Sequence, residues 1–348
     1  MQDTDFLALL VHRGHVERAD AQALLGRLRD GEALDDLLFD ELGWDDEKIE
    51  RMRRTRAGEW PEIPGYRIRE TLGTGGTATV YLARDLKRNR QVALKVLSRE
   101  AASHEPTRKA FIAEGRLLEK LSHPGLVRGF GVARAGPTFF SRLEAIQGST
   151  LLELLDGGRV FAEGEALEIV LRVAEVLRYL EEKGVVHRDV KPGNVMLAKD
   201  GRVVLIDLGF AATRGEETGA ESAVGTVAYL SPEQARGGAE ADIRSDIYSL
   251  GLSLFHLVVG KLPFESSDDR EVLRMQVMDS LRSPELKGRG ISPHLHYFIE
   301  KMVAKDAADR YQHWSELIAD VRGQLEGRDE LDFSTPPPRG GVRPRRRR

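Results

Sequence analysis

The change from helical to strand-like sequence after residue 65 constrains the fold more than any other feature. Three short strand-like segments follow it, separated by polar turns as in an antiparallel meander: residues 66–72, 79–84 and 91–97. A helix is expected over residues 106–121, where apolar residues recur at helical spacing, and beyond residue 151 the pattern is mostly helical. A small sheet followed by a larger helical part predicts an α+β fold.

Composition divides the 348 residues into three regions. Residues 1–60 carry 15 acidic and 9 basic side chains, and Pro61 and Pro64 then end the helical pattern. Residues 66–323 are the expected main domain. Residues 334–348 are rich in proline and arginine and lack apolar periodicity, so we expect a disordered tail.

The first region contains a candidate repeat. Segments 9–14 and 38–43 are alike at a spacing of 29 residues, and each precedes a charged helical run. One interpretation is a duplicated helical unit, whose start resembles the small helical repeats at the N-terminus of secretion ATPases. The alternative is a helical appendage without a repeat. Neither interpretation supplies a set of catalytic residues. We would expect such a module to bind a protein partner.

Composition also bears on environment and partners. The chain has no cysteine, so it has neither disulfides nor thiolate metal sites. No apolar run approaches the roughly 20 residues that cross a bilayer, and acidic residues stand where a secretory signal would be basic. The net charge is −4, and residues 61–332 alone carry about −4. We therefore expect a cytoplasmic protein without a membrane span, whose main domain does not bind nucleic acid.

A glycine-rich stretch between the first two expected strands is a candidate phosphate-binding loop. It contains Gly73, Gly75 and Gly76, and glycine lets backbone amides approach phosphates closely. Because the stretch joins two strands, it is neither a Rossmann nor a Walker loop. On this segment alone, a plain glycine-rich hairpin remains the alternative.

A charged pair is expected beside this loop. Lys95 lies in an apolar strand, where a buried ammonium group needs a partner. Glu114, nineteen residues later in the expected helix, is the candidate. Together with the glycine-rich loop, the two residues indicate a phosphate clamp fixed by a carboxylate.

The most specific motif is residues 187–194, HRDVKPGN, followed after thirteen residues by Asp207, Leu208 and Gly209. With this motif the chain resembles the bacterial Hanks-type, or eukaryotic-like, serine/threonine protein kinases over about residues 66–323. The resemblance implies a bilobal protein kinase fold, with a small antiparallel sheet lobe and a larger helical lobe. It also implies ATP and Mg²⁺ as cofactors and the serine and threonine hydroxyls of proteins as acceptors.

The resemblance also implies catalytic roles. Asp189 is expected to orient the acceptor hydroxyl and take its proton, and Lys191 to steady the γ-phosphate. Lys95, held by Glu114, is expected to bind the α- and β-phosphates. The expected Mg²⁺ ligands, both oxygen donors, are Asn194 and Asp207.

The nucleotide site implied by the resemblance has three parts. Leu72, Val80 and Ala93 are expected above the adenine and Met196 below it. The expected hinge, which follows the gatekeeper Leu143, is Glu144, Ala145 and Ile146. The loop over the phosphates comprises Leu72, Gly73, Thr74, Gly75, Gly76, Thr77, Ala78, Thr79 and Val80.

Regulation is expected through Arg188, which directly precedes the catalytic aspartate. In the family, such an arginine implies activation by a phosphate on the following segment, because phosphorylation adds negative charge and strong acceptors. Ser222 stands at the usual position, and Thr218 is the second candidate. We expect phosphorylation in trans within a transient homodimer.

Three further charged residues and one threonine are expected to have supporting roles. Glu233 should pair with Arg310, and Asp246 should support the catalytic loop from a buried helix. Thr226 should contact the catalytic aspartate and lysine as part of the substrate platform.

Other functions stay open at this stage. The fold could serve a pseudokinase or scaffold that binds ATP or a partner, or a small-molecule phosphotransferase. A third alternative gives the main role to an interaction module in residues 1–60. The arginine-rich tail is either a solvated segment or a binding site for anionic lipid, nucleic acid or an acidic partner.

Overall fold

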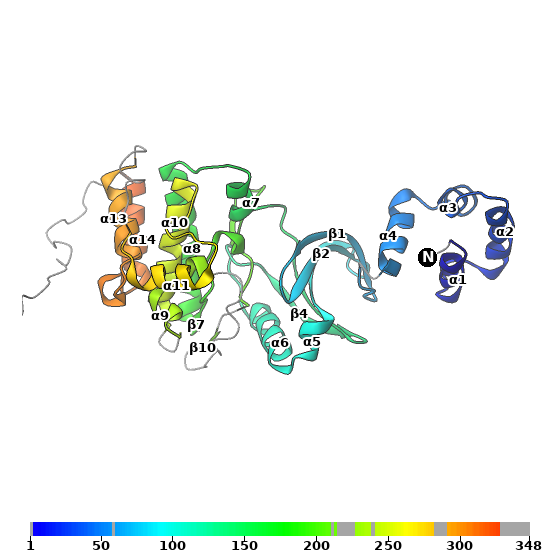
Figure 1. Ribbon diagram of the computed structural model, residues 1–348, viewed down its shortest axis with the longest axis horizontal. Helices are drawn as coiled ribbons and strands as arrows, with labels where there is room; N and C mark the ends of the chain where they lie inside the picture. The colour runs from blue at the N-terminus through cyan, green and yellow to red at the C-terminus, as the bar shows by residue number, and fades with distance from the viewer. Residues whose placement is uncertain are drawn as a thin grey trace, which may run out of the picture. The chain divides into compact units, whose positions relative to one another are not determined.

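The computed structural model describes residues 3–57, 60–209, 212–213, 227–237, 241–281 and 291–327. The chain divides into two compact units, Met1–Arg99 with Arg134–Phe139 and Glu100–Ala133 with Phe140–Arg348, and each is considered by itself (Figure 1). Some predicted positions lie outside the described residues, namely Thr218, Ser222, Thr226 and the tail 334–348.

The first unit begins with four helices, α1 (Asp3–His12), α2 (Arg18–Arg29), α3 (Leu34–Leu42) and α4 (Asp46–Ala57). Their apolar sides form one buried cluster that includes Phe6, Leu38 and Trp44. Arg53 of α4 joins the starts of two other helices, because its guanidinium donates to Asp3 at 2.9 Å and to Asp35 at 2.8 Å. These helices therefore have a hydrophobic core of their own.

The four helices form two similar pairs, but the register of the repeat differs from the predicted spacing of 29. Val16 N donates to the Leu10 carbonyl at 3.4 Å and Trp44 N to the Leu38 carbonyl at 3.1 Å, and all four residues are buried. Equivalent core positions are thus 28 residues apart. The predicted register aligned Gly14 with Gly43. Gly14 follows Leu10 by four residues, whereas Gly43 follows Leu38 by five, which accounts for the difference.

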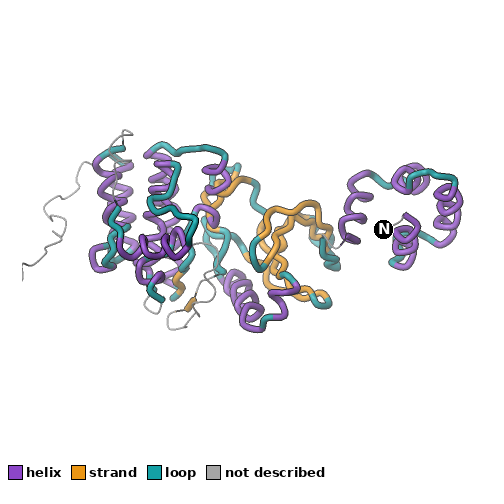
Figure 2. The backbone as a smooth tube through the Cα atoms, in the orientation of Figure 1, coloured by secondary structure: helices purple, strands orange, loops and turns teal. Residues whose placement is uncertain are grey.

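Three strands follow, β1 (Tyr66–Thr74), β2 (Ala78–Asp85) and β3 (Arg90–Leu97), and they form the predicted antiparallel meander (Figure 2). Val80 of β2 lies directly opposite Lys95 of β3, and the next pair on that face is Leu82 with Ala93. Because side chains alternate along a strand, Val80, Ala93 and Lys95 share one face of the sheet.

The later elements are mostly helical, so the predicted α+β class is confirmed. They are α5 (Arg99–Ser103), α6 (Glu105–Lys120), β4 (Gly129–Ala135), β5 (Thr138–Glu144), β6 (Gly148–Thr150), α7 (Leu151–Asp156), α8 (Glu163–Glu182), β7 (Val185–Val186), η1 (Pro192–Asn194), β8 (Val195–Ala198), β9 (Val203–Leu205), β10 (Ala212–Thr213), η3 (Val227–Tyr229), α9 (Pro232–Ala235), α10 (Ile243–Val259), α11 (Asp269–Met278), α13 (Pro293–Met302), η4 (Ala307–Asp309) and α14 (Trp314–Leu325).

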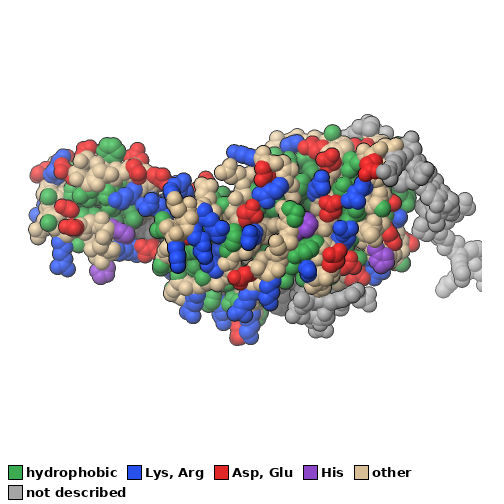
Figure 3. Space-filling model, turned by 180° about the vertical axis from the view of Figure 1, so that it is seen from behind, with side chains coloured by type: hydrophobic (Ala, Val, Ile, Leu, Met, Phe, Trp, Pro, Cys, Tyr) green, Lys and Arg blue, Asp and Glu red, His purple; other side chains and the backbone are tan. Residues whose placement is uncertain are grey.

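Helix α10 is the centre of the second unit, since nearly all of its residues are buried. It packs against α8 and α13, and α8 packs against α14 (Figure 1). Basic and acidic side chains are interspersed over this unit on the face drawn in Figure 3. Among the described helices, none combines the length and the apolar composition needed to cross a membrane.

Helix α6, which carries Glu114, packs unusually closely against β4. A Cβ atom on Gly115 would lie 2.2 Å from Val132 Cγ2, and one on Gly129 would lie 2.7 Å from the backbone of Leu118. Side chains do not tolerate such distances, so glycine is required at both positions for this packing. The close approach fixes where Glu114 lies within the second unit.

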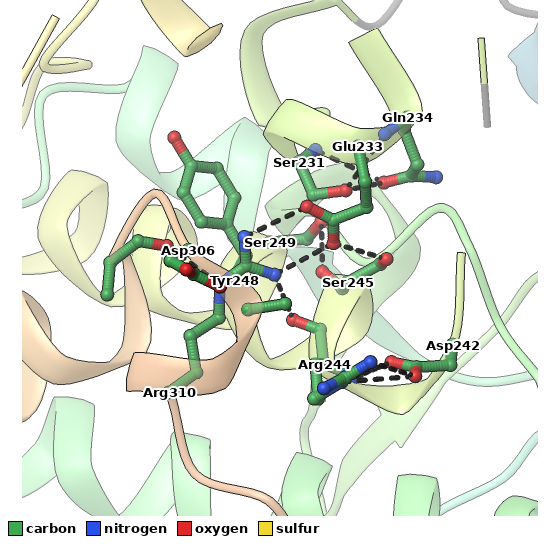
Figure 4. Close-up of polar contacts among 12 residues, drawn as sticks. Ser231, Glu233, Gln234, Asp242, Arg244, Ser245, Tyr248, Ser249, Asp306 and Arg310 are labelled. Carbon is green, nitrogen blue, oxygen red and sulfur yellow. Dashed lines mark hydrogen bonds and ion pairs between the residues drawn. The ribbon is translucent and has the colours of Figure 1, made fainter. Parts of the chain in front are cut away.

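A buried ion pair attaches α9 to the helical core (Figure 4). The Arg310 side chain is fully buried, and its two terminal nitrogens donate to Glu233 Oε1 and Oε2 at 2.8 and 2.9 Å. Ser245 Oγ on α10 also donates to Glu233 Oε1, at 2.6 Å. The predicted pair is confirmed. Burial acts to raise the pKa of Glu233, but Arg310 and Ser245 outweigh it and hold the pKa at about 2.

Replacing Arg310 by methionine is expected to lower the free energy of unfolding by about 3 kcal/mol at pH 7, because Glu233 then loses its buried cation. The pKa of Glu233 lies below its ordinary 4.5, so the contribution of the pair is complete above about pH 4.5 and is lost as the pH falls towards 2. Urea unfolding should therefore show a smaller difference between wild type and variant at pH 4 than at pH 7.

The control is Arg244→Met. Arg244 pairs with Asp242 at 2.8 Å, but both side chains are about one-third exposed, so the loss should stay below about 1 kcal/mol. Equal losses for the two variants would contradict the special role of the buried pair.

Gly115→Ala is expected to lower the free energy of unfolding by about 2 kcal/mol, because the added methyl group overlaps Val132. Gly164→Ala in α8 is the matched control, since a Cβ there meets nothing within 4 Å. That change should raise stability by about 0.5 kcal/mol through helix propensity. The close packing of α6 on β4 would be refuted if Gly115→Ala were as stable as Gly164→Ala in urea unfolding.

Candidate active site

The loop 187–194 joins β7 to β8 and ends in the 3-10 turn η1. A buried carboxylate on α10 organises its start. Asp246 Oδ2 accepts from His187 N at 2.9 Å, and Oδ1 accepts from Arg188 N at 2.7 Å. Asp246 is 2% exposed, and burial raises its pKa to about 6 against the opposing effect of His187 and Arg188. The predicted contact of Asp246 with the loop is confirmed.

Arg188 adopts a left-handed backbone conformation, with φ of 66°. Residues with a Cβ rarely occupy this region, because the side chain crowds the backbone. Here the neighbouring peptide groups are held from two sides. Asp246 binds the Arg188 N–H, and Gln234 Nε2 donates to the Arg188 carbonyl at 2.9 Å. These bonds hold the turn that presents Asp189.

His187 links the loop 187–194 to the segment that contains Asp207. Its ring is buried, Nδ1 accepts from Asp189 N at 3.2 Å, and Nε2 donates to the Asp207 carbonyl at 2.7 Å. These partners assign the neutral tautomer with its hydrogen on Nε2. The imidazole therefore connects the backbone of two predicted functional residues.

The structure brings together three of the predicted catalytic side chains. Asp189 Oδ2 lies 2.7 Å from Lys191 Nζ and accepts from Asn194 Nδ2 at 2.9 Å. Asn194 Nδ2 also donates to the Asp189 carbonyl at 2.8 Å, and the residue is 7% exposed. The Asp189 and Lys191 side chains are 14% and 19% exposed. The result is a partly buried carboxylate with a cation and an amide fixed on one oxygen.

Two further acidic residues of the second unit, Asp207 and Glu114, lie around Gly209. Asp207 Oδ1 accepts from Gly209 N at 2.9 Å. A Cβ built on Gly209 would be 3.3 Å from Asp207 Oδ1 and 3.9 Å from Glu114 Oε2. Glu114, which is 9% exposed, therefore points its carboxylate at the Asp207–Gly209 turn. Lys95 belongs to the first unit, and its pairing with Glu114 stays a prediction.

The predicted glycine-rich loop is the turn between β1 and β2, as expected. Gly75 N donates to the Ala78 carbonyl at 2.9 Å, and Gly73 lies opposite Val80 across the hairpin. The nine residues predicted here are the end of β1, the turn and the start of β2. The strand after the turn, β2, pairs with β3, on which Lys95 lies opposite Val80.

The remaining predicted nucleotide contacts divide between the units. In the first unit, Leu72 is 45% exposed and Ala93 is 6% exposed. In the second, Met196 lies on β8, and Ile146 lies in the connection before β6. Glu144 accepts from Arg202 at 3.0 Å, so this candidate hinge residue is tied to the start of β9.

Sequence patterns missed two glutamines that hold the backbone of this region. Gln234, on α9, donates to the Arg188 carbonyl, and Gln276, on α11, donates to the Ala228 carbonyl at 2.7 Å. Gln276 is fully buried. Their partners lie 46 and 48 residues away in the chain, so no local spacing signals either contact.

Comparison with known proteins identifies the family. Residues 66–320 match the model of the protein kinase domain. The chain is 34% identical over 273 residues to a probable serine/threonine-protein kinase of Streptomyces coelicolor, covering 75% of this chain and 40% of that protein. It is also 34% identical over 270 residues to the serine/threonine-protein kinase PknB of Mycolicibacterium smegmatis, covering 75% and 43%.

A third relative, the serine/threonine-protein kinase PknB of Mycobacterium tuberculosis, is 33% identical over 264 residues, or 74% of this chain and 42% of that protein. The match covers less than half the length of each of these relatives. The resemblance to bacterial Hanks-type kinases is confirmed, and the chain belongs to the protein kinase family.

Proposed function

We propose that this chain is an active serine/threonine protein kinase that transfers the γ-phosphate of Mg-ATP to serine and threonine hydroxyls of proteins. The observation that carries the proposal is the arrangement around Asp189, whose Oδ2 binds both Lys191 Nζ and Asn194 Nδ2. A carboxylate held in this way is oriented before a substrate arrives, which is what phosphoryl transfer requires of a protein.

In this mechanism the acceptor oxygen attacks the γ-phosphorus while the bond from that phosphorus to the bridging oxygen of ADP breaks. Asp189 orients the hydroxyl and accepts its proton, and we assign this role to Oδ1 because Oδ2 is already bound by Lys191 and Asn194. Lys191 stabilises the charge on the transferred group through its ammonium. Each role uses a side chain that its neighbours already orient.

Protein kinases generally use Mg²⁺ with ATP, and the donor atoms fit this ion. Asn194 donates through Nδ2 to Asp189, which leaves its oxygen Oδ1 as the atom for a cation. Asp207 adds a carboxylate, one oxygen of which is fixed by Gly209 N. Amide and carboxylate oxygens are ligands that Mg²⁺ accepts alongside phosphate oxygens. Bound there, the ion would neutralise charge on the phosphates.

The first unit supports a phosphate-binding role for its glycine-rich turn. A Cβ on Gly73 or Gly76 would meet nothing within 4 Å, and neither glycine has a positive φ. Neither packing nor backbone conformation in the described residues thus explains glycine there. Close approach of ATP phosphates to the backbone would explain it. We assign the α- and β-phosphates to Lys95 and the support of Lys95 to Glu114.

We assign the adenine to the apolar side chains already predicted for it. Val80 and Ala93 share a sheet face with Lys95, and Leu72 is the exposed residue before the turn. Met196 is assigned to the opposite side of the base. The hinge backbone at Glu144 to Ile146 is assigned to the adenine edge.

We further propose regulation by phosphorylation in trans, in a transient homodimer, at Ser222 or Thr218. Arg188 is the expected receptor for the phosphate, since arginine binds phosphate by paired hydrogen bonds. The helices of residues 1–60 have their own hydrophobic core and are proposed to bind a protein partner. A pseudokinase is the alternative function, but none of the side chains that transfer requires is replaced in this sequence.

Asp189→Asn and Lys95→Met are each expected to reduce phosphate transfer to a generic basic protein at least about a hundredfold, because they remove the base and the phosphate-binding cation. The measurement is incorporation of labelled phosphate from Mg-ATP, with phosphoamino-acid analysis expected to find serine and threonine.

The matched controls are Asp200→Asn and Lys199→Met in the exposed β8–β9 turn, which should keep wild-type activity. Equal transfer by wild type and by the Asp189 and Lys95 variants would refute the proposed activity. Binding of ATP by wild type without any transfer would instead favour the pseudokinase.

Joint replacement of Thr218 and Ser222 by alanine is expected to lower the activity of the purified kinase at least about tenfold, because Arg188 then has no phosphate to bind. Phosphatase treatment of wild type should reproduce the loss, and incubation with Mg-ATP should reverse it only in wild type. Mass spectrometry that finds neither residue modified in a fully active preparation would overturn this regulation.

A further inference from the structure

Gln234 makes an unusual set of contacts for a residue in the first turn of a short helix. Its Nε2 donates to the Arg188 carbonyl at 2.9 Å, while its Oε1 accepts from Ser231 N at 3.1 Å and from Ser231 Oγ at 3.0 Å. The two Ser231 donors identify Oε1 as the acceptor, so Nε2 is the atom that faces Arg188. Every polar atom of this amide is therefore engaged. Figure 4 shows Gln234 and Ser231 together at the start of α9.

The Arg188 carbonyl belongs to the same peptide group as the Asp189 amide. This peptide is therefore held at both ends: Gln234 Nε2 binds its oxygen, and His187 Nδ1 accepts from its N–H at 3.2 Å. A peptide unit is planar, so fixing both of its polar atoms fixes its orientation. The Cα of Asp189 lies in that plane, so it is placed together with the peptide, and Lys191 and Asn194 hold its carboxylate.

We propose that Gln234 is a positioning residue that sets the orientation of the catalytic Asp189 through the peptide joining Arg188 to Asp189. The inference rests on the proposed kinase activity and adds a residue to its machinery. Gln234 does not touch the reacting groups; it acts through the backbone.

The backbone at Arg188 explains why such a contact is needed. With φ of 66°, Arg188 occupies a conformation that persists only where the surroundings determine it. Asp246 holds the N–H side of Arg188, and Gln234 holds its carbonyl side. Without Gln234, the peptide that follows Arg188 loses the hydrogen bond to its oxygen, while Asp189 N still donates to His187 Nδ1.

The position of Gln234 is itself fixed by neighbouring contacts. Ser231 and Gln234 form a capping box at the start of α9. Glu233, which directly precedes Gln234, is held by buried Arg310. Gln234 therefore connects α9 to the catalytic loop, so the position of α9 affects the position of Asp189.

The test is Gln234→Glu, which keeps the size of the side chain and an acceptor for Ser231 but sets a carboxylate oxygen against the Arg188 carbonyl. We expect kcat to fall about tenfold, because a favourable contact becomes a repulsive one, with the KM for ATP unchanged. Hydrogen exchange of the peptide spanning residues 187–190 should become faster in the full-length variant.

Gln312→Glu is the matched control. Gln312 Nε2 also donates to backbone carbonyls, those of Ala307 and Arg310 at 3.0 and 2.7 Å, but these lie around η4. This variant should keep wild-type kcat and wild-type exchange in residues 187–190. An equal fall in kcat for both variants would mean a general loss of structure and would overturn the inference.

The two proposals fail in different ways. If wild type is active and Asp189→Asn is not, a wild-type kcat for Gln234→Glu overturns the positioning role alone. If wild type transfers no phosphate, the proposed function fails, and hydrogen exchange still decides the inference: unchanged exchange in residues 187–190 of Gln234→Glu overturns it, and faster exchange supports it.

Discussion

The candidate active site depends first on the carboxylate of Asp246. Two consecutive backbone amides, those of His187 and Arg188, donate to its two oxygens from a position that water scarcely reaches. Burial makes the charged form costly, as its raised pKa indicates, and the paired donors compensate for part of this cost. Since a carboxylate can bind both amides at once only in one orientation, it imposes the turn at Arg188 on the loop. The position of Asp189 is a consequence of that turn.

Helix α10, which carries Asp246, also holds the backbone from η3 to α9. Ser245 Oγ donates to Glu233, and Ser249 Oγ donates to the Tyr229 carbonyl at 2.8 Å. Ser249 lies four residues after Ser245 and three after Asp246, and both spacings place side chains on one side of a helix. The three residues therefore form a polar edge on an otherwise apolar, buried helix. One element, α10, therefore holds both the loop 187–194 and the backbone from η3 to α9. Gln234 joins those two parts a second time, directly.

Much of this arrangement could be predicted from the sequence. The contacts that were not predicted join residues far apart in the chain. Periodicity indicated the β1 to β3 meander and helix α6, and the motif at residues 187–194 identified the Asp189 cluster, because both signals are local. The contact of Gln234 with Arg188 joins positions 46 residues apart, and no local spacing signals it. The pair of Glu233 with Arg310 is 77 residues apart, but it was expected from the family resemblance, which supplied no such expectation for Gln234. The repeat in the N-terminal helices was assigned one residue out of register, because glycine marks the end of a helix while buried side chains define its core.

The described glycines differ in whether the packing of the fold requires them. At Gly115, Gly129 and Gly148, a Cβ would approach neighbouring atoms to between 2.2 and 2.7 Å, so the fold itself requires glycine there. At Gly73 and Gly76 a Cβ would meet no atom within 4 Å, and the backbone does not need a left-handed conformation. Glycine in an exposed turn costs conformational entropy, and nothing in the described structure compensates for that cost at these two positions. A ligand that approaches the backbone closely, such as the phosphates of the proposed nucleotide, would compensate. Gly26, Gly164 and Gly323, which lie in helices, also have open space around a Cβ and no positive φ. This property therefore supports the proposed phosphate-binding role only together with the place of Gly73 and Gly76 at the hairpin between β1 and β2.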